Sequence, residues 1–334
     1  MLEVTREQIL AFRRKTNALD ERLQKGKRSL RTAAWAGLQD SMPRAALLSI
    51  HARVQGATPM TWDDASLIQV WGPRYQVYVV AEQDLPLFTL ARMPEAGTLR
   101  ARAIDYAARL ELTLAGERKR DRDVFGAMKV GNSVRYATLT GRVAIRWEGA
   151  RAPLVWIVPP PEISAQKALL ELGRRHLHVF GPTSAPAFAT WAGIGAAAAT
   201  ATFENLAKEL VPVRTPIGDA WLLASDEAAL REPPVPTAPA RFLPSGDAFW
   251  LHGTAEERAL LVPTAKQRGE LWTPRVWPGA LLVGGEFAGT WRRSKRSFTI
   301  DAWRKLTAPE REAVVAEAES LPLPDPGPTV VAWS

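Results

Sequence analysis

Three consecutive polar residues, Gln39, Asp40 and Ser41, stand just before Pro43 and offer a carboxamide, a carboxylate and a hydroxyl group. A carboxamide can hold a water molecule through hydrogen bonds, and a neighbouring carboxylate adds basicity. The segment could therefore position water for a hydrolytic reaction. A plainer interpretation is that it ends one helix and that Ser41 caps the next. The sequence leaves both interpretations open.

The elements expected around this segment decide where its side chains point. A helix is expected over 30–40, and Pro43 is expected at the start of another. Successive side chains on a helix are rotated by about 100°, so Asp40 would point away from Gln39. The carboxylate would join the carboxamide only if the helix frays before the proline, where helical backbone is disfavoured.

The rest of the N-terminal two thirds reads as helices followed by β-hairpins. Thr5 is expected to cap a first helix, and strands over 67–71 and 77–80 follow the third helix. Three helices followed by a hairpin is the order of a winged helix. The same order recurs twice, with hairpins over 143–158 and 211–223. These repeats predict three winged-helix units.

The pattern of predicted elements changes after the proline-rich segment 231–239. Short strands, among them 249–251 and 259–262, are split by Gly and Pro and precede an amphipathic helix over 309–321. The predicted fold class is therefore α+β, with three tandem winged-helix domains followed by a C-terminal β-barrel-like domain. The expected domains are 1–95, 96–161, 162–232 and 233–334.

Positive charge is concentrated in two regions of the chain. The net charge is +8, and residues 1–54 carry eleven Lys and Arg against five Asp and Glu. Residues 266–305 carry nine against three, and the remainder is slightly negative. Genomic base composition could explain the abundance of Arg but not this placement. The placement favours a polyanionic partner, most often nucleic acid.

Composition also excludes several classes of protein. The chain has no cysteine, which removes disulfides, thiolate catalysis and thiolate zinc sites. Its four histidines have no paired spacing, so neither a metal site nor a cofactor is expected. No run of eighteen apolar residues occurs and the N-terminus is charged, which predicts a cytoplasmic protein rather than a membrane or secreted one.

Four motifs in one order carry a family resemblance. The first motif runs from Gly37-Leu-Gln39 through Arg53-Val54 and is similar to the family pattern Gly-Leu-Gln-x-x-x-Pro…Leu-x-x-Arg. The second motif is Trp71-Gly-Pro-Arg74 followed by Val77-Tyr-Val, and it is similar to the pattern Trp-Gly-x-Arg-Gly-Thr-Leu-His-Leu. In the second motif Tyr75-Gln76 replaces Gly-Thr and Tyr78 replaces His. The other two are Phe180-Gly-Pro182 to Gly193 and Pro263 to Trp291. Together they resemble the winged-helix DNA glycosylase superfamily of the AlkZ/YcaQ type.

The resemblance implies a function for the polar segment. In that family two side chains position the water that cleaves a damaged base from its sugar. Gln39 matches the first position, Ser41 takes the second in place of Gln or Asp, and Asp40 is the nearby carboxylate. The implied activity is that of a monofunctional glycosylase acting on alkylated or crosslinked bases. A non-catalytic DNA-binding protein, such as a regulator or lesion sensor, is the alternative, and a protein-interaction scaffold is a more remote one.

Double-stranded DNA is the expected partner of a monomer, and basic residues are expected to hold its phosphates. For any single one of them, a solvated surface position is the alternative. The predicted DNA-binding residues are Arg28, Arg31, Arg44, Arg53, Arg74, Arg135, Arg142, Arg146, Arg292, Arg293, Lys295 and Arg296.

Overall fold

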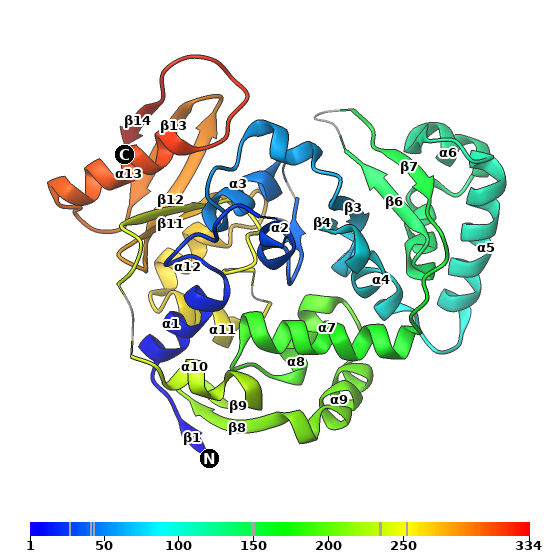
Figure 1. Ribbon diagram of the computed structural model, residues 1–334, viewed down its shortest axis with the longest axis horizontal. Coiled ribbons are helices and arrows are strands. Elements are labelled where there is room, and N and C mark those ends of the chain that lie inside the picture. Colours follow the sequence, from blue (N-terminus) through cyan, green and yellow to red (C-terminus); the bar gives the residue numbers. More distant parts are fainter. Residues whose placement is uncertain (27, 41, 43, 148–150, 234–235, 252) are drawn as a thin grey trace.

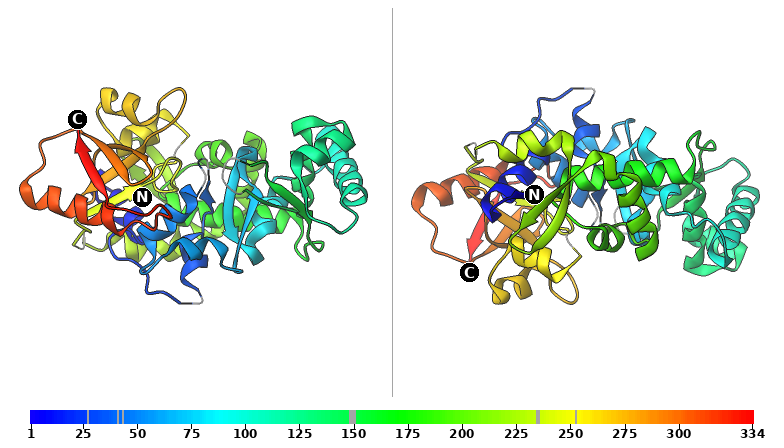
Figure 2. Two further views of the ribbon diagram at one scale, coloured as in Figure 1. Left: turned by 90° about the horizontal axis from the view of Figure 1, so that it is seen from above. Right: turned by 90° about the horizontal axis from the view of Figure 1, so that it is seen from below.

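Three β-sheets surrounded by helices make up the computed structural model, which describes the chain except for residues 27, 41, 43, 148–150, 234–235 and 252. The elements that follow the first helix lie at the centre in Figure 1, between the second unit on the right and the C-terminal module on the left. The third unit lies below them. Figure 2 places α5 and α6 at one end of the molecule and α13 at the other.

The N-terminal segment packs far from the hairpin that follows it. Strand β1 (Leu2–Glu3) pairs in parallel with β8 (Leu210–Thr215) of the third unit. Helix α1 (Arg6–Thr16) begins at Thr5, which forms the expected cap and a capping box with Gln8. Its apolar side chains pack against β8 and β9 and against the C-terminal module. The N-terminal segment of the expected first unit therefore packs against the third unit and the C-terminal module.

The helix expected over 30–40 is wrong beyond residue 33. Helix α2 (Ser29–Ala33) is short, and β2 (Leu38–Gln39) pairs with β4. Gly37 turns the chain between them with a φ of 70°, and a Cβ there would lie 2.7 Å from the Phe88 ring. Only glycine tolerates both the left-handed backbone and this close approach. Helix α3 (Ala45–Arg53) follows; its expected first residue, Pro43, lies outside the described residues.

One six-stranded sheet joins the first and second units, in the order β2-β4-β3-β6-β7-β5. Strand β3 pairs antiparallel with β6 through Gln69 and Ile145. The two expected hairpins are both present, but they share this sheet and so hold each other in a fixed position. Its strands are β3 (Leu67–Trp71), β4 (Val77–Ala81), β5 (Lys119–Arg120), β6 (Val143–Arg146) and β7 (Leu154–Ile157).

Most other helices agree with their sequence signals. Sequence signals also predict helices over 98–114 and 134–140; residues 98–114 form α5, whereas residues 134–140 lie in a 3₁₀ helix, η5. Among the described residues, no helix is both long and apolar enough to cross a membrane. The remaining elements of these units are η1 (Pro59–Asp63), η2 (Pro73–Tyr75), α4 (Leu85–Phe88), α5 (Thr98–Leu114), α6 (Asp121–Met128), η5 (Gly131–Thr140), α7 (Ala165–Phe180), α8 (Ala185–Ala192), α9 (Ala196–Asn205), β9 (Gly218–Leu223) and α10 (Glu227–Arg231).

The C-terminal module holds a five-stranded sheet in the order β10-β11-β12-β13-β14. Its described strands do not close into a barrel, because β10 and β14 are the two edges. The strands are β10 (Ala240–Leu243), β11 (Gly279–Val283), β12 (Glu286–Ser294), β13 (Ser297–Ala302) and β14 (Val330–Trp333), and the helices are α11 (Ala255–Leu261), α12 (Ala265–Leu271) and α13 (Ala308–Ser320).

Two of the strands expected in this module are wrong. Residues 249–251 form no strand, and most of 259–262 belongs to α11. The hydroxyl of Thr254 accepts a hydrogen bond from the Glu257 backbone and caps this helix, and acidic residues occupy its first turn. Both features stabilise a helix N-terminus, and here they outweigh the apolar run that suggested a strand.

Buried polar contacts attach the first unit to the C-terminal module. The backbone oxygen of His51, in α3, accepts a hydrogen bond from Arg22, whose guanidinium also forms an ion pair with Glu317 of α13. The His51 ring lies 3.1 Å from Arg22 Nη2 and 3.0 Å from Ser320 Oγ. Burial, and then the charges of Arg22 and Arg241, lower the pKa of His51 to about 3.

Replacing His51 with Gln is expected to make the free energy of unfolding decrease less steeply as the pH falls into the mildly acidic range. The unfolded chain binds a proton on His51 near pH 6.5 and the folded chain does not, so stability is lost as the pH falls from about 6.5 toward 3. His51 contributes on the order of 1 kcal/mol per pH unit in that window. Urea unfolding of wild type and His51→Gln between pH 7 and 4.5 measures the difference. Equal slopes would contradict a neutral, buried His51.

Candidate functional site

Gln39 and Asp40 lie on a strand end, so their side chains point to opposite sides of the sheet. The Gln39 side chain is 8% exposed. Its Oε1 accepts hydrogen bonds from Arg74 Nη2 at 3.1 Å and from the Tyr78 hydroxyl at 3.4 Å. The structure therefore places the carboxamide beside a guanidinium and a phenol, away from Asp40. Ser41 lies outside the described residues.

Asp40 is 1% exposed and is directed toward the start of α3. Its Oδ1 accepts from the Ala46 backbone at 3.0 Å, and its Oδ2 accepts from Gln69 Nε2 at 2.9 Å. Burial raises the pKa of Asp40 to about 7, against the opposing effect of its hydrogen-bond donors. Asp40 thus satisfies the amides of the α3 N-terminus, the part that the sequence assigned to Ser41, and both its oxygens are engaged.

The turn that carries Arg74 has unusual backbone geometry. Arg74 and Tyr75 have φ values of 55° and 58°, in the left-handed region that favours glycine. Such a conformation costs about 1–3 kcal/mol for each non-glycine residue. Arg92 lies 4.7 Å from the centre of the Tyr75 ring, and Tyr136 packs edge-on against that ring, which holds Tyr75 in place. Strain of this kind, held by tertiary contacts, is a common mark of a functional site.

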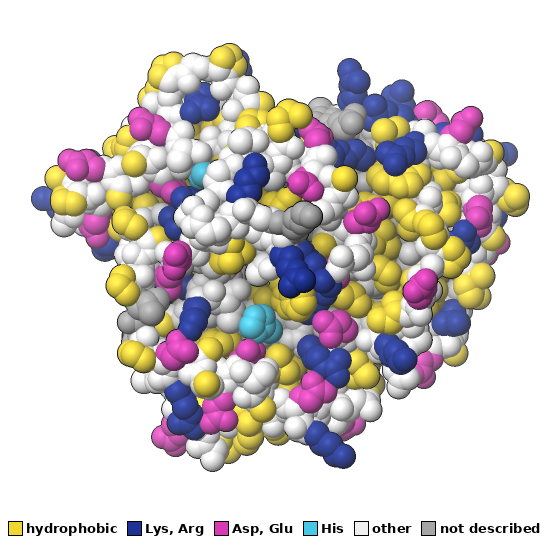
Figure 3. Space-filling model, viewed as in Figure 1, with side chains coloured by type: hydrophobic (Ala, Val, Ile, Leu, Met, Phe, Trp, Pro, Cys, Tyr) yellow, Lys and Arg dark blue, Asp and Glu magenta, His cyan; other side chains and the backbone are white. Residues whose placement is uncertain are grey.

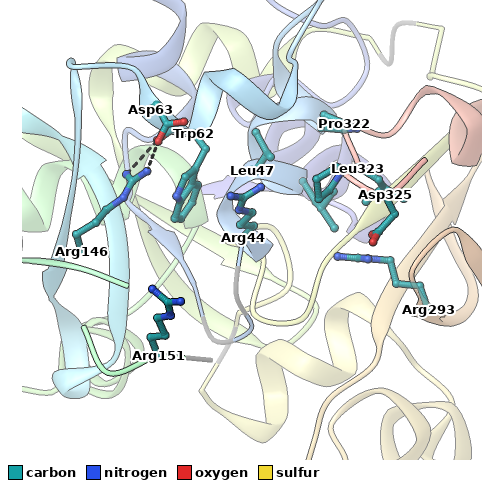
Figure 4. A pocket seen from close by; sticks show the side chains of 12 residues that line it. Arg44, Leu47, Trp62, Asp63, Arg146, Arg151, Arg293, Pro322, Leu323 and Asp325 are labelled. Carbon is teal, nitrogen blue, oxygen red and sulfur yellow. Dashed lines mark hydrogen bonds and ion pairs between the residues drawn. The ribbon is translucent and has the colours of Figure 1, made fainter. Parts of the chain in front are cut away.

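A cleft of about 570 Å³ opens at the start of α3, where Arg44 lines it. Figure 4 shows Arg44 in its middle, Arg146 and Arg151 on one side and Arg293 on the other. These four arginines come from the start of α3, the β6–β7 hairpin and the β12–β13 hairpin. A second hollow shares Leu48 and Arg293 with the cleft and so adjoins it. We call the two together the arginine cleft.

The charges of the arginine cleft do not cancel. Arg146 lies over the Trp62 ring and forms an ion pair with Asp63. Burial lowers the pKa of Arg293, and the nearby Asp325 carboxylate opposes that shift. Within the described part of the chain, no carboxylate pairs with Arg44 or Arg151. With Arg292 of the second hollow, five guanidinium groups therefore face two carboxylates, which leaves a positive surface suited to a polyanion.

The second hollow is linked to Gln39 only indirectly, through two arginines. Trp277 lines it, and the Arg258 guanidinium packs over that ring at 5.6 Å. Burial, and then the charge of Arg74, lower the pKa of Arg258, so Arg74 lies within electrostatic reach. The Arg74 guanidinium in turn contacts Gln39. Arg258, which packs on the Trp277 wall of the hollow, and Arg74, which contacts Gln39, are thus neighbouring charges, while Gln39 itself lines neither hollow.

The structure brings together some of the predicted DNA-binding residues and separates others. Arg44, Arg146, Arg292 and Arg293 line the arginine cleft. Lys295 and Arg296 lie at the nearby β12–β13 turn, where Arg296 donates to Thr329 Oγ1 at 2.9 Å.

The other predicted arginines lie elsewhere, most of them with partners within the protein. Arg53 is buried in a bidentate pair with Asp247, Arg31 pairs with Asp84, and Arg142 pairs with Glu111. Arg135 lies over the Trp71 ring and Arg28 lines a separate hollow.

Sequence reasoning missed Arg151, which contributes to the cleft without a paired carboxylate among the described residues. The signal that could have found it is a basic residue beside the turn of a predicted hairpin. Figure 3 shows Lys and Arg side chains gathered around the open end of the β6–β7 hairpin. Groups of His, Asp and Glu able to hold a metal ion do not occur in the part of the chain that the structure describes.

The mixed α and β fold and its basic cleft define a nucleic-acid-binding class of protein, and comparison with known proteins identifies the family. The chain belongs to the AlkZ-like DNA glycosylase family, whose profile, described as "DNA glycosylase AlkZ-like", matches residues 32–322. The resemblance in the sequence is thereby confirmed. The solved structure of the Streptomyces sahachiroi DNA glycosylase AlkZ is similar in fold, with a TM-score of 0.77, 15% identity and coverage of 100% of both chains. No curated protein matches.

Proposed function

We propose that the protein binds duplex DNA in the arginine cleft and releases cationic, N-alkylated bases from it slowly. The observation that carries this proposal is the convergence of Arg44, Arg146, Arg151 and Arg293, from three separate parts of the chain, on one cleft, with Arg44 five residues after Gln39 in the sequence. Guanidinium groups on both sides of an opening suit the phosphates of the two strands. Membership in the AlkZ-like family supports DNA as the substrate. Crosslinked bases are a further candidate lesion.

The chemistry requires little of the protein. When a base is alkylated on a ring nitrogen it is cationic, so the C1′–N bond breaks readily as the electron pair leaves with the base. Water then adds at C1′ and loses a proton to solvent. The protein has to orient the nucleotide and stabilise the oxocarbenium-like centre. Gln39 matches the first water-positioning residue of the family motif, while Asp40 is enclosed and fully hydrogen-bonded. We therefore expect slow turnover.

The second candidate function is lesion binding without excision. The enclosure of Gln39 between Arg74 and Tyr78 favours this candidate, because its oxygen is already occupied. For both candidates we propose that one copy acts on one site and that residues 1–95, 96–161 and 162–232 serve as three winged-helix-like units, with residues 233–334 supplying the β12–β13 turn to the cleft.

Release of 7-methylguanine from a duplex carrying N7-methylguanine tests the proposal. We expect wild type to exceed spontaneous depurination, at a rate on the order of a hundredfold below a site with both water-positioning groups. Gln39→Ala should abolish release without changing affinity for undamaged duplex, and Ser41→Gln should raise it.

The remaining variants separate the candidates. If Asp40→Asn abolishes release while Gln39→Ala does not, Asp40 holds the water and the assigned register is incorrect. If neither wild type nor Ser41→Gln releases base above the spontaneous rate, excision is refuted and lesion binding remains. Absence of duplex binding at low salt refutes both candidates.

A further inference from the structure

We infer that Arg74 is a positioning residue that turns the Gln39 carboxamide so that its N–H groups, and not its oxygen, are presented to bound DNA. Gln39 then acts as a hydrogen-bond donor to an acceptor atom of the bound nucleotide. The inference rests on the proposed function, because it takes DNA as the ligand of this region. It assigns Arg74 to the support of Gln39 rather than to a phosphate.

Hydrogen-bond accounting fixes the orientation of the carboxamide. A guanidinium has five N–H donors and no acceptor. Arg74 Nη2, 3.1 Å from Gln39, must therefore face the oxygen of that side chain, because the reverse orientation would set two donors against each other. The Tyr78 hydroxyl approaches the same oxygen at 3.4 Å. Both lone pairs of Oε1 are thus occupied by the protein.

The opposite end of the carboxamide is the part left open. No described residue accepts a hydrogen bond from Gln39 Nε2, and this atom is not among the fully enclosed polar atoms that lack a partner. Its two hydrogens therefore remain to be satisfied by water or by a ligand. An amide nitrogen donates and does not accept, so Gln39 in this orientation cannot take a proton from attacking water.

Arg74 is itself held from two other directions. Its Nη1 donates to the Trp191 backbone oxygen at 2.8 Å, at the end of α8. Gly193, the C-cap of that helix, lies so close that a Cβ there would be 3.0 Å from the Arg74 nitrogen. The left-handed backbone of Arg74 places the guanidinium between α8 and Gln39. A residue held this firmly sets the orientation of a neighbour and is not free to follow a phosphate.

The Gln39→Glu variant shows whether the carboxamide acts on DNA through its N–H donors or through its oxygen acceptor. The carboxylate introduced by this change would still accept from Arg74 and Tyr78 but would present no donor. We expect Gln39→Glu to match Gln39→Ala, with at least a tenfold loss of 7-methylguanine release and a three- to tenfold loss of preference for a 2′-fluoro N7-methylguanine duplex over undamaged duplex. Wild-type or faster release by Gln39→Glu would overturn the inference, since it would show the oxygen acting as acceptor.

Arg74→Gly tests the positioning directly. Glycine relieves the left-handed backbone, so this variant is suited to fold, and Arg74→Lys is the conservative rescue. We expect Arg74→Gly to lower lesion preference in wild type and to have no further effect in Gln39→Ala, with partial recovery in Arg74→Lys. A loss of affinity for undamaged duplex, with the salt slope reduced by about one, would overturn the inference by showing that Arg74 binds a phosphate.

An abasic duplex identifies the acceptor. If the acceptor is on the base, the difference between wild type and Gln39→Ala disappears on abasic DNA, and if it is on the sugar or phosphate the difference persists. No difference between the two proteins on either duplex would overturn the inference.

The side-chain amide signal of Gln39 in a ¹⁵N–¹H spectrum, identified by its loss in Gln39→Glu, gives a readout without DNA. Arg74→Gly should shift it in the free protein. An unaltered signal overturns the positioning role of Arg74 whatever DNA does. A wild type that binds no duplex overturns the proposed function and the DNA ligand of Gln39, but not the orientation.

Discussion

Reversing Arg44, Arg151 and Arg293 to Glu together is expected to weaken duplex DNA binding roughly a thousandfold at about 50 mM salt. All three guanidinium groups line the arginine cleft, and Arg44 and Arg151 have no paired carboxylate among the described residues. Each phosphate contact releases about 0.9 of a counterion, so losing three should reduce the slope of log affinity against log salt by roughly 2.7. Fluorescence anisotropy across a salt series measures both quantities.

The control carries the same change of charge elsewhere. Lys167, Lys208 and Lys305 are exposed and lie outside the cleft. Their reversal to Glu lowers the net charge by the same six units, so it should weaken binding only through the general field of the protein, with little change of salt slope. Equal losses for the two triple variants would remove the cleft from the interface and leave only net charge as the cause of binding.

Asp247→Ala is expected to lower the free energy of unfolding by about 3–5 kcal/mol, the cost of leaving a buried charge without its partner. Arg53 donates to both oxygens of Asp247 at 2.7 Å, and both side chains are almost fully enclosed. The Ser49 hydroxyl donates to the same carboxylate at 2.6 Å. Urea unfolding, followed by tryptophan fluorescence, measures the loss.

Two further variants show whether the loss comes from the unpaired charge. Arg53→Met combined with Asp247→Ala removes both charges and should recover much of the stability. Asp219→Ala breaks the exposed pair with Arg214 and should cost less than about 1 kcal/mol. If the double variant is no more stable than Asp247→Ala, lost packing is the cause rather than the unpaired Arg53.

Local signals predicted the elements whose causes are local. Thr5 caps α1 through a bond to Gln8, three positions away, and the hairpins are defined by alternating apolar residues. The strand at Leu38–Gln39 was not predictable in this way, because it depends on pairing with β4 and on Gly37 lying against Phe88. The sheet shared by β3 and β6 depends likewise on contacts across the chain.

The site was predictable in its residue types more than in its geometry. Arg44, Arg146 and Arg293, selected for their charge, do line one cleft. Arg53 and Arg31 looked equivalent in the sequence, but their carboxylate partners, Asp247 and Asp84, lie far along the chain; the first pair is buried, whereas Arg31 pairs with Asp84 and stays partly exposed. The direction of the Asp40 side chain followed from the strand that replaced the expected helix. The charge of a residue is known from the sequence, whereas its ion-pair partner depends on the tertiary structure.

The contacts of the first fifty residues with the C-terminal module constrain how the chain is made. Arg22 and His51 are satisfied by Glu317 and Ser320, and β1 by β8. At a synthesis rate of roughly 5–20 residues per second, the partner of His51 leaves the ribosome some 15–50 s later. During that interval Leu10, Leu48 and Ala52 lack the C-terminal side chains on which they pack, so the nascent chain exposes apolar surface. Truncating the final helix should therefore expose the N-terminus to proteolysis first.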